Sequence, residues 1–401
     1  MHDIPAAATD ASLLTITGVD RPGIAAEFAR LLDNAGVTLL DIEQGVVHGH
    51  CNLTFLVAFQ DAAAGDNLLA EVRARALALD LHLEVATVDV ALHHGRRARQ
   101  TWAVTLLAPH LGAAILAGAT EAASVRGFHV DSIHRLSNQS LSAIELRLSA
   151  DATADATALQ TDLLALQVRF GCDVALQREG LTRRSKRLVV MDMDSTLIQQ
   201  EVIDELARMH GVFDQVAGIT HRAMNGEIDF DEALRERVAL LAGAPESILT
   251  DVQDRIHLMP GADRLIRVLK GLGYRLAVLS GGFIEVAEPI CQRLGLDYVF
   301  ANQLEIADGK LTGRVLGAIV NRKRKAELLE TIANTERIAL DQVIAIGDGA
   351  NDLDMLHKAG LGIAFNAKQV VREQARFTVN LRHLDAILYL LGIGDIEAGQ
   401  I

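Results

Sequence analysis

The sequence predicts an α/β protein with a Rossmann-like parallel-sheet core, a helical cap inserted into that core, and two ferredoxin-like βαββαβ domains before it. Two observations predict this fold. A pattern of strands and helices occurs twice in the N-terminal part with a period of roughly ninety residues, and from Leu188 onward strands alternate with helices. The chain has 401 residues, whereas one domain usually has ~100–200. We expect domains at residues 1–92, 101–180 and 185–401.

The first repeat has the order strand, helix, two paired strands, helix and strand. Its first strand is LLTITG, followed by a helix that Pro22 and Gly23 open and Gly36 closes. The other elements are VTLLDIEQGVV and NLTFLVAF as strands, DNLLAEVRARALAL as a helix and HLEVATVDV as a strand. This order is typical of a ferredoxin-like sandwich.

The second repeat has the same order of elements. They are WAVTLLAP, a helix that ends at Gly127, HVDSIHRLS, SAIELRLSA, a helix from Ala152 to Gly171, and CDVALQRE. The polar runs HHGRRARQ and REGLTRRSKR follow the two repeats, and we interpret both as solvated linkers.

The third region contains strands that are apolar almost throughout, as expected when helices cover both faces of a parallel sheet. These strands are RLVVMDM, YRLAVLS, DYVFAN, QVIAIGD and LGIAF. Between the first two, the amphipathic runs EVIDELARMHG, DFDEALRERVALL and PESILTDVQDRI predict a helical cap at about residues 199–271. The run IADGKLTG, with Asp308 and Gly309, predicts a small hairpin.

Composition excludes several classes of function. The net charge is −14, with one Trp and three Tyr and without a basic stripe, so we expect no nucleic-acid partner. No stretch is long and apolar enough for a membrane span, and the N-terminus does not resemble a signal peptide, so we expect a cytoplasmic protein. Cys51, Cys172 and Cys291 are expected to be buried thiols.

Polar residues stand where the predicted parallel strands end. They are Asp192 and Asp194 after the first strand, Ser280 and Gly281 after the second, and Asp348, Asn351 and Asp352 after the fourth. Lys325 lies near the start of a helix between them. Because ligands of open α/β sheets bind outside the carboxyl ends of the strands, we expect these residues to form one site.

Four carboxylates at one sheet edge would repel one another, and a hard divalent cation removes this repulsion. Mg²⁺ takes oxygen ligands and pairs with substrate phosphate, so we predict Asp192 and Asp348 as ligands with Asp352 in support. The absence of a Cys/His cluster argues against zinc.

A carboxylate beside Mg²⁺ and a phosphate can attack phosphorus and form an aspartyl phosphate that water later hydrolyses, which predicts Asp192 as nucleophile. Asp194, on the same side of an extended strand, is placed to protonate the leaving oxygen and then deprotonate the water. Ser280, Gly281 and Lys325 offer donors to the phosphoryl oxygens. Each motif alone could equally be a turn or a helix cap; the set in this order favours chemistry.

DMDSTL, LSGGF, a lysine before a helix and GDGANDLDML, in this order, resemble the four motifs of the haloacid dehalogenase superfamily of aspartate-nucleophile phosphatases. The resemblance covers Leu188 to Leu391. The runs DMDSTLIQQEVIDELA, NGEIDFDEALRERVALL and LDYVFAN narrow it to the phosphoserine phosphatase family. It implies a Mg²⁺-dependent hydrolase core that converts O-phospho-L-serine to L-serine, the last step of serine biosynthesis.

The resemblance also implies roles for individual residues. Asp192, Asp348 and the carbonyl of Asp194 would hold Mg²⁺, and Ser280, Gly281, Lys325 and Asn351 would contact the substrate. In the cap, Glu201 would meet the amino group of the substrate, Arg237 its carboxylate, and Phe230 would shield the pocket. An anion and a cation suit a zwitterionic amino acid. Without the resemblance, Glu201 and Arg237 would be assigned to solvated helix surface.

The two N-terminal repeats resemble ACT domains, which commonly bind amino acids between paired copies and regulate an attached enzyme. TGVDRPGI fits their ligand loop and implies effector contacts at Gly18, Asp20 and Gly23, whereas the second copy has LLAPHLGA there and lacks DRPG. The resemblance implies L-serine as an inhibitory effector and a homodimer. A purely structural role in dimerisation stays open.

Two other functions also stay open. One is a related phosphatase or phosphotransferase that acts on another small phosphate ester, for example by passing phosphate to homoserine. The other is an amino-acid-sensing regulatory protein with a vestigial catalytic half, against which the intact set of Asp192, Asp194, Lys325 and Asp348 argues. A P-type pump also forms an aspartyl phosphate, but it needs membrane helices that this sequence does not predict.

Overall fold

The structure is a computed structural model that describes residues 10–59, 62–89, 100–138 and 141–401. The chain divides into two compact units, residues 1–99 and 100–401. The first unit contains one ferredoxin-like repeat, and the second contains the other repeat together with a seven-stranded sheet.

The first repeat has the predicted βαββαβ order. Its elements are β1 (Asp10–Val19), α1 (Ile24–Asn34), β2 (Thr38–Val47), β3 (His50–Ala58), α2 (Ala62–Ala78) and β4 (His82–Asp89). The strands form an antiparallel sheet in the order β2-β3-β1-β4. Phe28 of α1 and Phe55 of β3 are buried in one cluster with Val72 of α2, so both helices pack on the same face of the sheet.

The second repeat has the same order and the same sheet topology, β6-β7-β5-β8. Its elements are β5 (Gln100–Ala108), α4 (Ala113–Val125), β6 (His129–Arg135), β7 (Ser142–Ala150), α5 (Ala156–Phe170) and β8 (Asp173–Arg178). Helix α5 begins at Ala156 and not at the predicted Ala152. The reason is Asp155, whose carboxylate accepts the backbone N–H groups of Thr157 and Ala158 at 3.0 Å and so caps the helix.

The seven-stranded sheet has the order β12-β11-β10-β9-β13-β14-β15. Its strands are β9 (Leu188–Met191), β10 (Arg275–Phe283), β11 (Tyr298–Ala307), β12 (Lys310–Leu316), β13 (Val343–Gly347), β14 (Leu361–Phe365) and β15 (Phe377–Val379). All paired neighbours are parallel except β11 and β12, which form the predicted hairpin. Asp308 and Gly309 both have positive φ, as a two-residue hairpin turn requires.

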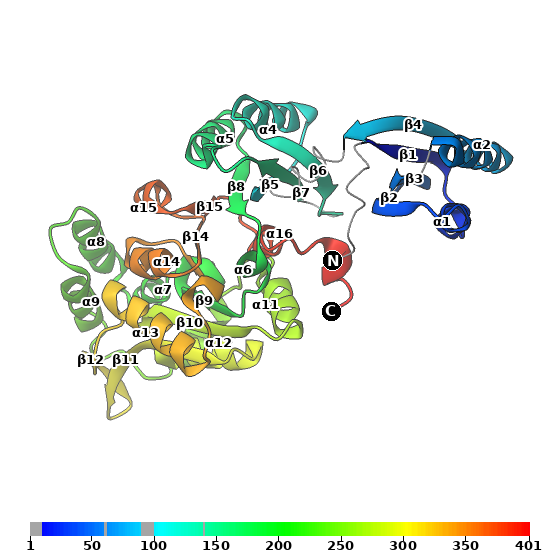
Figure 1. The fold of residues 1–401 in the computed structure, drawn as a ribbon. Coiled ribbons are helices and arrows are strands. Elements are labelled where there is room, and N and C mark those ends of the chain that lie inside the picture. Colours follow the sequence, from blue (N-terminus) through cyan, green and yellow to red (C-terminus); the bar gives the residue numbers. More distant parts are fainter. Residues whose placement is uncertain (1–9, 60–61, 90–99, 139–140) are drawn as a thin grey trace. The chain divides into compact units, whose positions relative to one another are not determined.

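Helices cover both faces of this sheet (Figure 1). Leu188 and Val190 of β9 belong to the core beneath α13 (Arg322–Thr335) and α14 (Leu353–Lys358). The alternate residues, Val189 and Met191, belong to the other core, where α11 (Ala262–Gly271), α12 (Ile284–Leu294) and α16 (Ala386–Leu390) pack. Burial on both faces explains why the strands are apolar without alternation.

The insertion between β9 and β10 is helical, as predicted. It contains α7 (Val202–His210), α8 (Phe213–Met224), α9 (Phe230–Ala239) and α10 (Ile248–Asp251), followed by α11. Helix α8 was not among the predicted runs. Three short helices near the C-terminus were also not predicted, namely α15 (Gln369–Gln374), α16 and α17 (Asp395–Ala398).

The interpretation of REGLTRRSKR as a solvated linker is wrong for Arg183 and Lys186, which are buried, although most of the described residues of the run are exposed. This run forms α6 (Leu181–Arg184), and the side chain of Arg183 is 2% exposed. Arg183 lies 2.5 Å from Glu145 of the second repeat and 2.6 Å from Glu179. These carboxylates make burial of the guanidinium tolerable, because a buried charge needs a partner. Of the other run, HHGRRARQ, all residues before Gln100 lie outside the described residues.

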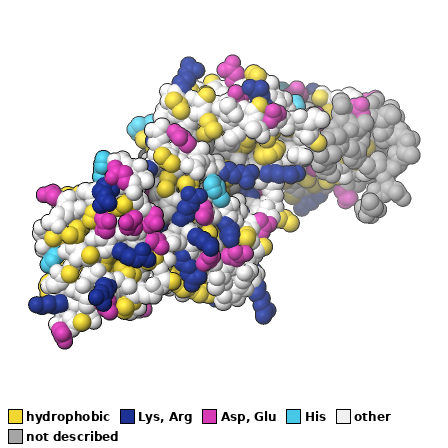
Figure 2. Space-filling view, turned by 90° about the vertical axis from the view of Figure 1, so that its left-hand side faces the viewer, with side chains coloured by type: hydrophobic (Ala, Val, Ile, Leu, Met, Phe, Trp, Pro, Cys, Tyr) yellow, Lys and Arg dark blue, Asp and Glu magenta, His cyan; other side chains and the backbone are white. Residues whose placement is uncertain are grey.

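The three cysteines are free and buried, which confirms the prediction for them. Among the described residues, no helix has both the length and the apolar character needed to cross a membrane. On the face of the molecule in Figure 2, basic side chains are interspersed with acidic ones.

Candidate active site

Asp192 is the first residue after β9 and lies at the carboxyl edge of the sheet. Its backbone N–H donates to the carbonyl of Ile346 at 2.9 Å, so the acid follows the last paired residue directly. Its carboxylate oxygen Oδ1 accepts the backbone N–H of Met193 and the Nζ of Lys325, both at 2.8 Å. A tight turn over Met193–Leu197 follows, with Ser195 at φ 56°. Asp192 and Lys325 are both buried, so their charges face each other without water between them.

Asp352 orients the loop after β13 and also binds the lysine. Its Oδ1 accepts Nζ of Lys325 at 2.7 Å, and its Oδ2 accepts the backbone N–H groups of Asp348 at 3.1 Å and Gly349 at 3.0 Å. Gly347 makes room for it, since a Cβ there would lie 2.5 Å from the Asp352 carboxylate. Asp352 therefore acts as support for Lys325 and for the loop that carries Asp348.

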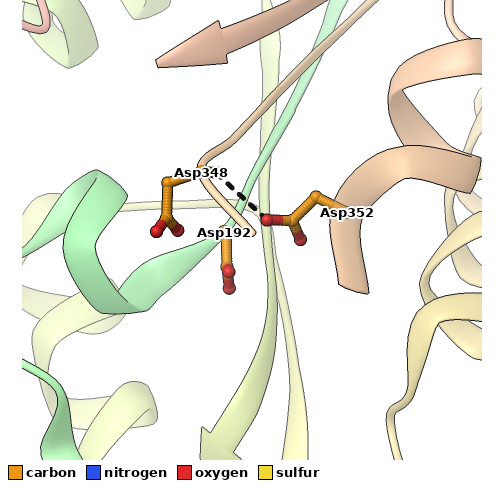
Figure 3. Close-up of side chains that lie close together, drawn as sticks. All are labelled: Asp192, Asp348 and Asp352. Carbon is orange, nitrogen blue, oxygen red and sulfur yellow. Dashed lines mark hydrogen bonds between the residues drawn. The ribbon is translucent and has the colours of Figure 1, made fainter. Parts of the chain in front are cut away.

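The carboxylates of Asp192, Asp348 and Asp352 can each place one oxygen within 4.8 Å of the others. In the view of Figure 3, Asp192 lies between the other two, and Asp352 bonds to the backbone at Asp348. An all-oxygen donor set of this kind fits Mg²⁺. Because both Asp352 oxygens already accept hydrogen bonds, Asp192 and Asp348 are the better ligands. The Asp194 side chain is not part of this cluster; its predicted contribution is the backbone carbonyl.

Burial of these acids raises their pKa values. The pKa of Asp192 lies well above the usual range because of burial and the neighbouring charge of Asp352, which Lys325 only partly offsets. Burial, together with Asp352, raises the pKa of Asp348 to about 7. Burial alone would lower the pKa of Lys325, but Asp192 and Asp352 outweigh it and the net shift is upward. One lysine does not balance this many buried acids, so the site has room for further positive charge.

The side chain of Asp194 lies next to the segment Ser280-Gly281-Gly282. A Cβ on Gly282 would lie 2.8 Å from Oδ2 of Asp194 and 3.1 Å from Oγ of Ser280, so glycine allows the two side chains to converge there. This segment lies inside β10, which continues to Phe283, and not after the strand as predicted; the pairing register shifts there. Burial and the charge of Glu201 raise the pKa of Asp194 well above its usual range, which suits a proton donor.

The predicted cap residues lie near the same site. Glu201 precedes α7 and accepts the hydroxyl of Ser195 at 2.8 Å. Arg237 of α9 is half-buried; burial lowers its pKa, and the charges of Glu201, Asp204 and Asp194 oppose that shift. The cation of Arg237 and these three acids are thus close enough to interact.

Phe230 begins α9, and its ring lies over Gly281. A Cβ on Gly281 would be 2.9 Å from Cζ of Phe230. Asn351 lies in the turn between Asp348 and Asp352 and is half-buried. The structure therefore brings the predicted residues of the core and the cap to one edge of the sheet.

Three polar residues at this edge were not predicted from the sequence. Asn302 is 1% exposed; its Nδ2 donates to the carbonyl of Gly281 and its Oδ1 accepts the backbone N–H of Val320, both at 2.8 Å. Buried Thr196 donates its hydroxyl to Asp348 at 3.5 Å. The third is Asp204, on the first turn of α7. Asn302 could have been predicted, because it is a polar residue at the end of the apolar run DYVFAN.

The three predicted effector residues line two separate cavities in the first repeat. Gly18 lines a cavity of about 870 Å³, together with Glu43, Asn52 and His82. Asp20 and Gly23 line a second cavity of about 410 Å³ at the start of α1. Polar side chains and backbone groups line both cavities. Both are open to solvent, whereas Asp192, Asp348 and Asp352 are buried.

Comparison with known proteins assigns the chain to a family. Residues 189–357 match the model of haloacid dehalogenase-like hydrolases, and residues 11–86 match the ACT domain. The chain is 46% identical over 391 residues to the phosphoserine phosphatase of Streptomyces coelicolor, covering 97% of this chain and 94% of that protein. It is 42% identical over 393 residues to phosphoserine phosphatase SerB2 of Mycobacterium tuberculosis, covering 97% and 95%.

Solved structures agree with this assignment. A haloacid dehalogenase-family hydrolase from Salmonella enterica serovar Typhi has a TM-score of 0.65 and 32% identity, covering 73% of this chain and 98% of that one. A probable phosphoserine phosphatase from Vibrio cholerae, without ligand, has a TM-score of 0.59 and 32% identity, covering 76% and 90%. The chain therefore belongs to the phosphoserine phosphatase family of phosphoric monoester hydrolases, with a haloacid dehalogenase-like domain preceded by two ferredoxin-like repeats of the ACT type.

Proposed function

We propose that the protein hydrolyses O-phospho-L-serine to L-serine and phosphate through an aspartyl phosphate on Asp192, in a Mg²⁺-dependent reaction. The observation that carries the proposal is the buried contact of Asp192 with Lys325, beside Asp348 and Asp352. The relatives named phosphoserine phosphatase, which match nearly the whole chain, support the choice of substrate.

In the first step, a carboxylate oxygen of Asp192 attacks phosphorus, and the bond between phosphorus and the serine oxygen breaks. Asp194, whose pKa is raised by burial and by the charge of Glu201, gives a proton to the leaving serine oxygen. In the second step, Asp194 takes a proton from water as the water attacks phosphorus, which releases phosphate and restores Asp192. The ammonium of Lys325, the hydroxyl of Ser280 and the N–H of Gly281 would stabilise the phosphoryl oxygens.

Asp192, Asp348 and the carbonyl of Asp194 would hold Mg²⁺, and Asp352 would support them from behind. When bound, the ion would supply the positive charge that one lysine does not provide among these buried acids, and it would neutralise substrate phosphate.

The cap would select the amino acid part of the substrate. Glu201 can bind its ammonium group and Arg237 its carboxylate, since the two side chains have opposite charge and lie close enough for their charges to interact. Phe230 would cover the pocket from above Gly281, and Asn351 would contact the substrate from the loop after β13. Serine would leave this pocket as the product of the last step of its biosynthesis, in the cytoplasm.

A substrate panel with and without Mg²⁺ tests this proposal. Phosphoserine, phosphothreonine and a generic aryl phosphate are compared by phosphate release, and homoserine is added as a possible acceptor. We expect a strong preference for phosphoserine, no activity after removal of Mg²⁺ by chelation, and no phosphohomoserine. Equal rates for all esters, metal-independent turnover or transfer to homoserine would contradict it.

We also propose that the chain is organised as ACT domains at residues 1–92 and 101–180 and a phosphatase domain at 185–401, with its cap at about 199–271. L-Serine would bind the first repeat in one of its two cavities, either the one lined by Gly18 or the one lined by Asp20 and Gly23, and would inhibit the enzyme, provided that it favours one of two conformations. The test compares rates with and without millimolar serine after product inhibition has been measured separately. Identical rates would contradict inhibition.

A homodimer is supported by the edge strands of both repeats. Edge strand β2 exposes Leu39, Ile42 and Val46, and edge strand β6 exposes Val130 and Ile133. Exposed apolar side chains on an unpaired strand favour pairing with another chain. Light scattering during size-exclusion chromatography should give twice the mass of one chain, and a monomer at micromolar concentration would contradict this.

A further inference from the structure

The first turn of α9 contacts the catalytic core at two consecutive residues. The Phe230 ring lies over Gly281, as described above. The next residue, Asp231, accepts the side-chain Nδ2 of Asn321, at 3.1 Å to Oδ1 and 3.3 Å to Oδ2. Asp229 fixes the turn itself, because its carboxylate caps α9 by accepting the N–H of Glu232 at 2.8 Å. A helix of the cap is thus attached to the core at the turn whose Phe230 ring lies over Gly281.

Asn321 is also the residue that starts the lysine helix. Its Oδ1 caps α13 by accepting the backbone N–H of Arg324 at 3.1 Å, and its carbonyl accepts the backbone N–H of Lys325 at 2.9 Å. Lys325 in turn reaches Asp192 at 2.8 Å. The side chain of Asn321 therefore contacts the cap with its NH₂ group while its oxygen caps the helix that presents the catalytic lysine.

The backbone just before Asn321 is held in place by a second set of hydrogen bonds within the core. Val320, which precedes Asn321, donates its N–H to buried Asn302, and Asn302 donates to the carbonyl of Gly281. The side chain of Asn302 thus connects Gly281 with Val320, just before α13. Any shift of α9 relative to Asn321 would also be a shift relative to Gly281.

The other end of α9 is held by the backbone. After this helix, the N–H of Gly243 donates to the carbonyl of Leu311 at 2.8 Å, and the N–H of Leu311 donates to the carbonyl of Ala244 at 2.9 Å. By contrast, the ion pairs of Arg222 with Glu236 and of Arg208 with Glu205 join residues of the insertion to each other. The contact of Asp231 with Asn321 is a side-chain hydrogen bond that ties the first turn of α9 to the core.

We propose that Asp231 and Asn321 are positioning residues for substrate binding. Their hydrogen bond holds the first turn of α9 against the core, so that Phe230 covers Gly281. Arg237, two turns along the same helix, is thereby held near the acids with which its charge interacts. The inference rests on the proposed function, since it requires that the amino acid part of the substrate binds beneath α9.

The variant Asn321→Asp tests the pair without removing the helix cap. Aspartate still accepts the N–H of Arg324, so α13 is retained, but a second carboxylate now faces Asp231 and the hydrogen bond is lost. We expect the KM for phosphoserine to rise by about tenfold or more, as for loss of a hydrogen bond to a charged group, with a smaller change in kcat. Adding Asp231→Asn restores a donor opposite the new carboxylate, and the KM should return toward that of the wild type.

The control is Glu232→Gln on the same turn, at an exposed position, which should leave both constants unchanged. Melting temperatures of all variants are measured in parallel. A wild-type KM in Asn321→Asp, or a rise in KM that Asp231→Asn does not reverse in a folded protein, would overturn the proposal. A lower melting temperature with unchanged KM would show a purely structural role and would overturn it too. If the wild type does not hydrolyse phosphoserine, the proposed function fails, and the same variants are compared on the ester that the panel identifies.

Discussion

The catalytic edge of the seven-stranded sheet and the first ferredoxin-like repeat differ in the burial of their charged side chains. At the edge, Asp192, Asp348 and Asp352 are buried around the ammonium of Lys325, and burial raises the pKa values of Asp192 and Asp348. In the first repeat, Asp20 is exposed at the rim of an open cavity. Buried acids with too few positive charges nearby are stabilised when a cation and a substrate bind, which is typical of a catalytic site. Exposed groups around a cavity are solvated by water, so they can bind a ligand but do not require one.

The two repeats differ in a related way, although they share one topology. The second repeat is part of the same compact unit as the seven-stranded sheet. Asp173 of β8 accepts hydrogen bonds from Asn380 and Leu381, just after β15, and Arg183 connects Glu145 of the second repeat with the carbonyl of Leu390. The first repeat forms a unit of its own. We therefore expect damage to the second repeat to affect stability and damage to the first to affect regulation.

The largest effect should come from Asp192→Asn. Asparagine keeps the shape of the side chain but removes the nucleophile, so we expect kcat to fall by about 10⁴-fold or more, as when a nucleophile of this kind is removed. Serine binding to the first repeat, measured by calorimetry with the catalytic pocket blocked by phosphate, should persist. Loss of both turnover and serine binding in a folded variant would contradict the view that the two regions act separately.

A large loss of stability is expected for Arg183→Met. The change removes the 2.5 Å partner of Glu145, which is 3% exposed and keeps only the contact with Arg147 at 3.4 Å, and breaking a buried pair costs about 3–5 kcal/mol. The matched control is Arg126→Met, which removes the solvent-exposed pair with Asp162 and should cost far less. Urea unfolding followed by hydrogen exchange should show the loss in residues 100–401 and not in the first repeat. Equal costs for the two variants would contradict this.

A smaller effect is expected for Asn302→Ala. The change leaves the carbonyl of Gly281 and the N–H of Val320 unpaired in a buried place, which costs about 1–3 kcal/mol. Because Gly281 is a proposed phosphate ligand, we also expect kcat to fall and inhibition by inorganic phosphate to weaken. A folded variant with wild-type kcat would show that Asn302 is not needed to position Gly281.

The smallest effect on turnover should come from Asp20→Ala in the first repeat. Without serine, the rate should equal that of the wild type, because Asp20 is exposed in a separate unit from the catalytic edge. With millimolar serine, inhibition should weaken or disappear. Inhibition that is unchanged in this variant would exclude Asp20 from the effector site.

Sequence patterns predicted the parts of the fold that depend on local periodicity. The strands buried on both faces and the hairpin at Asp308 and Gly309 are examples. Strand β15 has three residues, which is too short for any period to show. Helix α8 contains Gly218 and the β-branched Thr220, which lower helix propensity and obscure its pattern.

The site was predicted where polar residues follow strand ends, and missed where a role depends on distant partners. Arg183 looks like part of a basic linker until Glu145, 38 residues away, is placed beside it. The two backbone partners of Asn302 likewise come from other elements. The pair of Asp231 and Asn321 spans 90 residues, and neither position shows any sign of it in the sequence.

Chemical trapping of the aspartyl phosphate tests the central claim most directly. The enzyme is mixed with phosphoserine and Mg²⁺, quenched during turnover with borohydride, which reduces an acyl phosphate to an alcohol, and digested for mass spectrometry. The account predicts homoserine in place of aspartate at position 192, and unmodified Asp192 in the sample without substrate. Modification at another aspartate, or an unmodified Asp192 in a sample that turns over normally, would contradict it.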